Sequence, residues 1–228
     1  MTYEALADNV ARVREQVARV QAAEGLGHAV TIVAVTKGQP VTAVHAAWRA
    51  GLTDVGENRV QDALGKLGAV TAPVRWHLIG HLQTNKAKFV PGAFAMVHSV
   101  DSVRVAEALS RAAVQRAAEV PVLVQVNVAE EPQKSGCSAA EAGALLELCA
   151  RLPGLSARGL MTMAPFTDDV AVQRRTFAAL RALRDTLATP AHPLPELSMG
   201  MSGDYPAAVA EGATMLRLGT VLFGERSG

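Results

Sequence analysis

The sequence predicts a single (β/α)8 barrel, an α/β fold, with one extra helix before the first strand. Half of the 228 residues are hydrophobic, which is enough to fill the core of one domain. Eight short apolar segments alternate with amphipathic stretches, as in a parallel sheet whose strands are joined by helices. Polar residues gather after the apolar segments, where barrels of this type carry their functional groups. An open doubly wound sheet is the alternative, but no G-x-G-x-x-G motif follows the first strand.

The predicted elements follow one another along one domain, residues 1–228. The chain opens with an amphipathic helix that ends before Gly25, and its apolar stripe is Leu6, Val10, Val13, Val17 and Val20. Strands are predicted at 30–36, 52–56, 74–80, 94–99, 121–128, 156–161, 194–198 and 214–218. Helices are predicted at 41–50, 58–68, 82–90, 101–118, 138–151, 169–188 and 204–211. Asp101 is the expected N-cap of the clearest of them.

Charge and composition exclude several classes of function. Twenty-two basic and 21 acidic residues leave a net charge of +1, so no basic face predicts binding to nucleic acid or to a membrane surface. No apolar stretch is long enough for a membrane span, and the first residues are too acidic for a secretory signal. Cys137 and Cys149 form neither a ligand cluster nor a disulfide framework. We therefore expect a soluble cytoplasmic protein.

Lys37 is the most informative residue of the chain. It ends the apolar, β-branched run 30–37, which reads as a strand buried on both faces. A lysine amine in a sheltered pocket loses its proton easily and forms Schiff bases with carbonyl compounds. A lysine at a strand end is more often a solvated stop signal, so the functional interpretation needs support from other residues.

The loops after the seventh and eighth predicted strands supply that support. Residues 198–203 are rich in serine and glycine, and Gly219-Thr220 opens a short helix. Hydroxyls and backbone N–H groups at such positions form anion sites, and these two loops commonly hold a phosphate in barrels. Each loop taken alone could be an ordinary turn. A lysine and a phosphate site together indicate a phosphorylated aldehyde, of which pyridoxal phosphate is the commonest.

Arg217 adds a more specific expectation. It lies two residues before Gly219, so the two point to the same side of the eighth strand. A guanidinium there would donate a hydrogen bond to the pyridine nitrogen and keep it unprotonated, which limits carbanion chemistry. The alternative is an ion pair with an acid such as Glu57 inside the barrel.

Other reactive side chains are weaker candidates. His77 and His81 are four residues apart, which on a strand is roughly 13 Å and too far for one zinc ion. Three lysines could be rival amines, but they fall in polar segments that we expect to be exposed. They are Lys86, Lys88 and Lys134.

Several segments then resemble the YggS/PROSC family of pyridoxal-phosphate homeostasis proteins, over nearly the whole chain. They are VAVTK at 33–37, GENRVQ at 56–61, WHLIGHLQTNK at 76–86, VN at 126–127, KSG at 134–136, RGLM at 158–161, LSMGMS at 197–202, RLGT at 217–220 and FG at 223–224. The resemblance implies a barrel like the N-terminal domain of alanine racemase, with pyridoxal phosphate on Lys37. It also implies phosphate contacts from Ser202, Gly219 and Thr220, Arg217 near the pyridine nitrogen, and Asn58 and Met199 lining the pocket.

Three functions remain open at this point. The resemblance favours a carrier that holds pyridoxal phosphate and hands it to apo-enzymes, without a catalytic reaction of its own. An amino-acid racemase needs a second base opposite the lysine, which in alanine racemase is a tyrosine from another domain. The chain ends at Gly228 after the predicted barrel, and neither Tyr3 nor Tyr205 is a convincing second base. A class I aldolase would use Lys37 with Glu57 as the proton relay. We expect a monomer.

Overall fold

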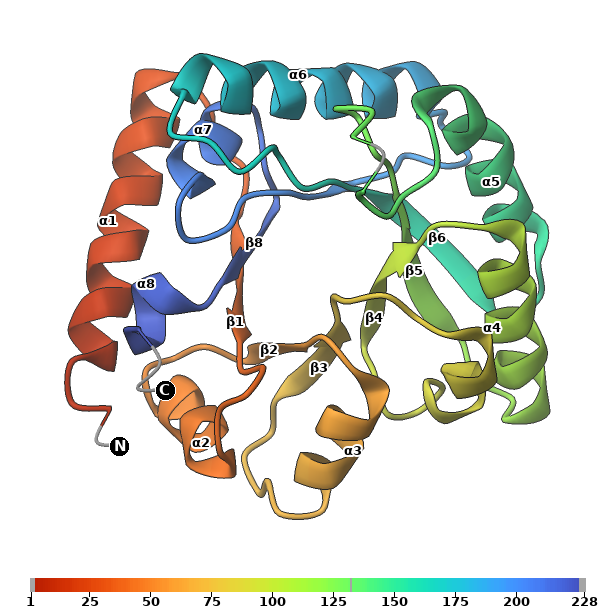
Figure 1. Ribbon diagram of the computed structural model, residues 1–228, viewed down its shortest axis with the longest axis horizontal. Coiled ribbons are helices and arrows are strands. Elements are labelled where there is room, and N and C mark those ends of the chain that lie inside the picture. The colour runs from red at the N-terminus through yellow and green to blue at the C-terminus, as the bar shows by residue number, and fades with distance from the viewer. Residues whose placement is uncertain (1–2, 132, 226–228) are drawn as a thin grey trace.

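Eight parallel strands form a closed barrel in sequence order, which confirms the predicted fold class. The computed structural model describes residues 3–131 and 133–225 (Figure 1). The barrel closes where β1 pairs with β8, in the register Val33 to Arg217. The strands are β1 (Thr31–Val35), β2 (Asp54–Glu57), β3 (Arg75–Leu78), β4 (Met96–Val100), β5 (Val120–Gln125), β6 (Leu155–Met161), β7 (Glu196–Ser198) and β8 (Met215–Leu218).

Helices follow the strands and surround the barrel, as Figure 1 shows. They are α1 (Leu6–Ala23), α2 (Val41–Arg49), α3 (Val60–Leu67), α4 (Val103–Gln115), α5 (Ala139–Arg151), α6 (Val170–Leu187), α7 (Tyr205–Ala210) and α8 (Thr220–Phe223). The predicted helix at 82–90 is instead a short 3-10 helix, η1 (Thr84–Phe89).

Two further local predictions are wrong, for identifiable reasons. The strand predicted at 194–198 begins only at Glu196, because Leu194 is fully buried but has a left-handed backbone with φ 47°. The apolar, buried character of Leu194 therefore led to the wrong prediction of a strand residue there. The N-cap of α4 is Ser102 rather than Asp101, and no side chain caps that helix end. The Asp101 carboxylate instead pairs with His81, at 3.3 Å from Nδ1.

The extra helix α1 packs against the end of the chain. It contacts α7 and α8, and Figure 1 shows it alongside α8. Its predicted apolar stripe faces inward, because Leu6, Val10, Val13 and Val17 are all buried. The Asn9 side chain also donates a hydrogen bond of 2.7 Å to the backbone carbonyl of Leu222 in α8. The helix thus fixes the segment that follows β8, where the phosphate site is predicted.

The hydrophobic core has two parts. The larger lies mostly between strands and helices, and the smaller consists of Met96, Leu123, Met161 and Met215, with Met163 against it. Met215 lies two residues before Arg217, so both point to the same side of β8. Polar side chains are buried on that side as well, which is unusual for a barrel filled by branched apolar residues.

Candidate functional site

Lys37 is exposed at the end of β1, on a backbone that is held firmly in place. The preceding residue, Thr36, is fully buried, and its backbone N–H donates to the carbonyl of Gly56 at 2.9 Å. The Thr36 hydroxyl donates to a carboxylate oxygen of Glu57 at 2.7 Å. A turn follows at Gly38, whose φ of 67° suits glycine. The amine therefore projects from a fixed strand end into solvent.

A second lysine, Lys66, which was not identified from the sequence, binds the end of β1 through hydrogen bonds. Lys66 in α3 donates to Glu57 Oε1 at 2.6 Å and to the backbone carbonyl of Thr36 at 2.8 Å. Glu57 is completely buried, and within the described residues its second oxygen has no hydrogen-bond partner. The spacing from Val60 and Ala63, both buried, could have indicated that Lys66 faces inward. Glu57 therefore pairs with Lys66, and the alternative pairing with Arg217 is wrong.

The loops after β7 and β8 meet at the predicted phosphate site. The Ser202 hydroxyl accepts hydrogen bonds from the backbone N–H groups of Gly219 and Val221, both at 3.2 Å. Thr220, between them, is exposed. Gly200 holds the first loop close to α7: its φ is 95°, and a Cβ there would lie 2.6 Å from the Cβ of Ala208. The structure thus brings Ser202, Gly219 and Thr220 together beside β1. Ser202, Gly219 and Val221 form a cup at the predicted phosphate site.

Arg217 is buried inside the barrel, two residues before Gly219 of this cup. Its guanidinium donates to the Ser198 hydroxyl at 2.7 Å and to the backbone carbonyl of Thr162 at 2.9 Å. Burial lowers the pKa of Arg217 to about 10, and the negative charge of Asp204 opposes that shift. The side chain is therefore a cation at neutral pH. No further protein acceptor for the guanidinium is found among the described residues.

The other two predicted pocket residues, Asn58 and Met199, differ in how accessible they are to a ligand. Asn58 follows β2 and is half-buried, with the backbone of Gly80 pressed against it. The side chain of Met199 is fully buried in the larger core cluster, so it exposes no surface to a ligand. Its part in the pocket stays a prediction from the resemblance.

The histidines do not form a metal site. Among the residues that the structure describes, no group of three or more His, Cys, Asp or Glu side chains is placed to hold a metal ion. His77 is buried and bonded to His98 and Asp54, whereas His81 is exposed beside Asp101. His98 is a buried polar residue that the sequence reasoning overlooked within an apolar strand.

Two of the rival amines, Lys86 and Lys134, are half-buried rather than exposed as expected, and Lys88 is exposed. Lys134 is paired with Glu131 and bonded to the backbone carbonyl of Ala164 at 2.8 Å. Both cysteines are buried free thiols, and burial raises the pKa of Cys137 to about 11 and that of Cys149 to about 12. None of these groups competes with Lys37 at the strand end.

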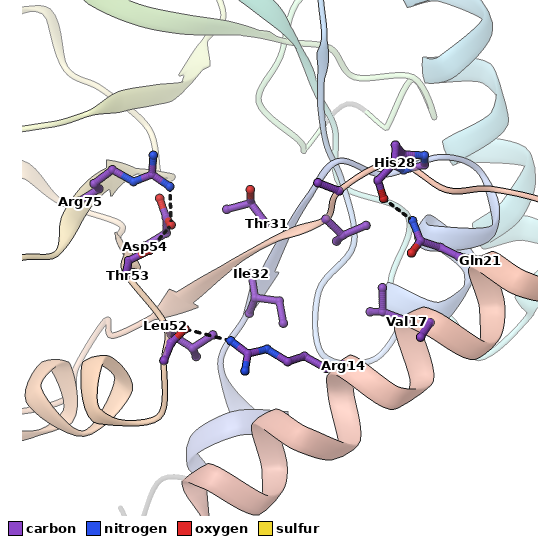
Figure 2. A pocket seen from close by; sticks show the side chains of 14 residues that line it. Arg14, Val17, Gln21, His28, Thr31, Ile32, Leu52, Thr53, Asp54 and Arg75 are labelled. Atoms are coloured by element: carbon purple, nitrogen blue, oxygen red, sulfur yellow. Dashed lines mark hydrogen bonds and ion pairs between the residues drawn. The ribbon is translucent and has the colours of Figure 1, made fainter.

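A cavity of about 420 Å³ lies at the opposite end of the barrel (Figure 2). It is lined by residues of α1 and by the N-terminal parts of β1, β2 and β3, including Arg14, Thr31, Asp54 and Arg75. It is therefore separate from the site at Lys37. None of the helices in the described ranges is long and apolar enough to cross a membrane.

Comparisons with known proteins agree with this geometry. The model of the alanine racemase N-terminal domain matches residues 2–227. The pyridoxal phosphate homeostasis protein of Pseudomonas aeruginosa is 43% identical, over 97% of this chain and 96% of its own length. The structure of PipY from Synechococcus elongatus with PLP bound superposes with a TM-score of 0.85 at 37% identity, covering 96% of this chain and 100% of PipY.

Full-length alanine racemases share only the fold. That of Corynebacterium glutamicum is 16% identical, with a TM-score of 0.69, and the alignment covers 99% of this chain but 62% of the racemase. The curated relatives, by contrast, match along nearly their full length. The chain therefore belongs to the YggS/PROSC family of pyridoxal phosphate homeostasis proteins, built on the barrel of the alanine racemase N-terminal domain.

Proposed function

We propose that this protein binds pyridoxal phosphate as a Schiff base on Lys37 and takes part in holding and delivering the cofactor inside the cell. The observation that carries the proposal is the adjacency of two groups. The strand that ends in Lys37 is hydrogen-bonded to β8, and β8 leads into the cup of Ser202, Gly219 and Val221. An amine and an anion cup on neighbouring strands match the aldehyde and the phosphate of one small molecule.

The residues present fit this cofactor. When bound, pyridoxal phosphate supplies an aldehyde for an amine and a ring that can accept electrons. Ser202, Gly219 and Thr220 would hold its phosphate through a hydroxyl and backbone N–H groups. Arg217, which has N–H groups without a protein acceptor among the described residues, would donate to the ring nitrogen. Because an arginine keeps its proton, that nitrogen would stay unprotonated.

Delivery rather than catalysis is supported by the relatives and by the tyrosines. Similar proteins over nearly their whole length are named for homeostasis of the cofactor, whereas the likeness to racemases is confined to the fold. The Tyr3 hydroxyl is bonded to Gln39 at 3.2 Å, and Tyr205 starts α7 with its pKa raised by burial. Neither is poised as the second base that racemisation requires.

Borohydride reduction followed by peptide mapping tests the Schiff base. We expect the purified protein to be yellow and the reduced adduct to lie on Lys37. Lys37→Ala should abolish the adduct, and the matched variant Lys86→Ala should retain it. An adduct that persists in Lys37→Ala would move the linkage to another lysine, with Lys134 examined next.

Reactivation of an apo-enzyme tests delivery. The loaded protein and free pyridoxal phosphate are compared at the same cofactor concentration. Faster reactivation by the loaded protein supports transfer to apo-enzymes, and equal rates would reduce the role to storage. Exchange of the α-hydrogen of alanine at enzymatic rates would instead favour the racemase. The same preparation in gel filtration tests the proposed monomer, and fractionation of cells tests the cytoplasmic location.

A further inference from the structure

A chain of four hydrogen bonds runs through the inside of the barrel from Arg217 to Asp54. Arg217 Nη1 lies 2.7 Å from Ser198 Oγ, and Ser198 Oγ lies 2.8 Å from His98 Nδ1. His98 Nε2 lies 2.9 Å from His77 Nδ1, and His77 Nε2 lies 2.8 Å from Asp54 Oδ1. This hydrogen-bond chain therefore links β8 to β7, β4, β3 and β2, and all five of its side chains are buried.

All four bonds are best satisfied in one direction. The guanidinium can only donate, so Ser198 accepts from it and must place its own proton on another atom. Its one remaining partner among the described residues is His98 Nδ1, which therefore accepts. His98 then carries its proton on Nε2 and donates to His77 Nδ1. His77 in turn donates from Nε2 to the carboxylate of Asp54.

The charges at the two ends agree with that direction. Although burial by itself raises the pKa of Asp54, hydrogen bonds from His77 and Arg75 outweigh it and lower the pKa to about 2. Burial, with smaller electrostatic contributions from His77 and Arg217, lowers the pKa of His98 well below its usual value, so His98 is neutral. A cation at one end and an anion at the other polarise the neutral groups between them, and each bond strengthens the next.

We propose that Ser198, His98, His77 and Asp54 are positioning residues that orient Arg217 toward the cofactor ring and hold it charged. This rests on the proposed function in one respect, since it takes Arg217 as the partner of the ring nitrogen. The chain would make the electronic state of the cofactor depend on Asp54, which lies at the far end of the barrel. Figure 2 shows Asp54 there, paired with Arg75 at the edge of the cavity.

The chain does not serve as a proton conductor between its ends. Moving one proton from Arg217 to Asp54 would neutralise both, against pKa values of about 10 and about 2. The neutral pair is therefore disfavoured by roughly eight powers of ten. Asp204 near Arg217 and Arg75 beside Asp54 both favour the charged arrangement. Glu119, Arg158 and Glu196 also line the cavity that Asp54 and His77 face at the far end of the barrel.

The first test uses the cofactor-free protein, so that it does not depend on the proposed function. Long-range ¹H–¹⁵N NMR at pH 7 should find His98 and His77 protonated at Nε2 only. The guanidinium N–H signals of Arg217 should exchange slowly in the wild type and quickly in Asp54→Asn or His98→Leu. A proton on Nδ1 of His98, or Arg217 signals that do not change in either variant, would overturn the proposal.

The second test uses the loaded protein. Asp54→Asn preserves the shape of the side chain and removes its charge, so it serves if His98→Leu fails to fold. We expect it to shift the pH titration of the cofactor absorbance and to weaken cofactor binding about tenfold, as for loss of a hydrogen bond to a charged group. Met96→Leu changes a nearby core residue that is not part of the hydrogen-bond chain, so it should change neither the absorbance titration nor the cofactor affinity. An unchanged titration in Asp54→Asn refutes the coupling, whereas failure of the wild type to bind cofactor refutes the proposed function alone.

Discussion

Gly80→Ala should destabilise the protein and disturb the proposed cofactor pocket. A Cβ at residue 80 would lie 2.4 Å from the backbone oxygen of Asn58 and 2.8 Å from its Cα. Ordinary contact begins near 3.4 Å, so one of the two backbones must move by about 1 Å. Gly80 cannot withdraw freely, because its carbonyl accepts a 2.7 Å hydrogen bond from the Ser99 hydroxyl. The displacement therefore falls on Asn58, a predicted pocket residue.

Two opposing effects set the size of the change. Replacing glycine by alanine restricts the unfolded chain and by itself stabilises a protein by about 0.4–1 kcal/mol. Overpacking against a rigid backbone costs about 1–3 kcal/mol, and we expect it to dominate here. For a chain of this length, a net loss of about 1–2 kcal/mol lowers the melting temperature by roughly 2–8 °C.

Urea unfolding followed by circular dichroism measures this loss, and the absorbance of bound cofactor reports on the pocket. Gly65→Ala is the matched control, because Gly65 lies inside α3 and, apart from the backbone of its own helix, nothing lies within 4 Å of the position that a Cβ would take. That variant should gain about 0.5–1 kcal/mol. Equal stabilities of the two variants, or a Gly80→Ala protein as stable as the wild type, would refute the reasoning.

Three further changes test other contacts. Lys66→Met should cost about 3–5 kcal/mol in urea unfolding by leaving the buried Glu57 carboxylate unpaired, and the loss should shrink when Glu57→Gln is added. Ser138→Ala removes the capping box of α5 and should cost about 1 kcal/mol, whereas a cost near zero would contradict the cap. The pKa of His98 is lowered by burial, so the unfolded state binds more protons than the folded state below about pH 6.5. The free energy of unfolding should therefore decrease as the pH is lowered below that value, by up to about 1.4 kcal/mol per pH unit. His98→Leu should flatten that slope.

The sequence predicted the barrel and the place of its functional end, because both depend on local patterns. Lys37, Gly219 and the loop 198–203 were predicted from their positions after apolar segments, and the parallel topology brings such strand ends to one face. That argument needs no knowledge of side-chain partners. Within that loop, Ser202 itself was named only by the family resemblance. The boundaries of the short strands were less accurate, since buried residues such as Leu194 lie outside the ladder.

Contacts between distant side chains could not be predicted in the same way. Lys66 has the appearance of an ordinary surface lysine until α3 is placed against β1 and Glu57. His98 lies in an apolar strand, and only the closed barrel brings it to Ser198, a hundred residues later. Each pairing depends on register and strand order together, so neither the Lys66 partner of Glu57 nor the Ser198 partner of Arg217 could be predicted from the sequence.

In the proposed site, Arg217 is held rigidly, whereas the phosphate cup keeps its hydrogen bonds when no cofactor is bound. This combination suits a carrier, which must both bind and release its cofactor. Arg217 is fixed from inside the barrel, so the ring would meet the same donor at every binding event. The N–H groups of Gly219 and Val221, in contrast, already have an acceptor in the Ser202 hydroxyl. Departure of a phosphate would therefore not leave these N–H groups without an acceptor. Lys37 is exposed as well, so water can reach a bond formed there and release the cofactor by hydrolysis.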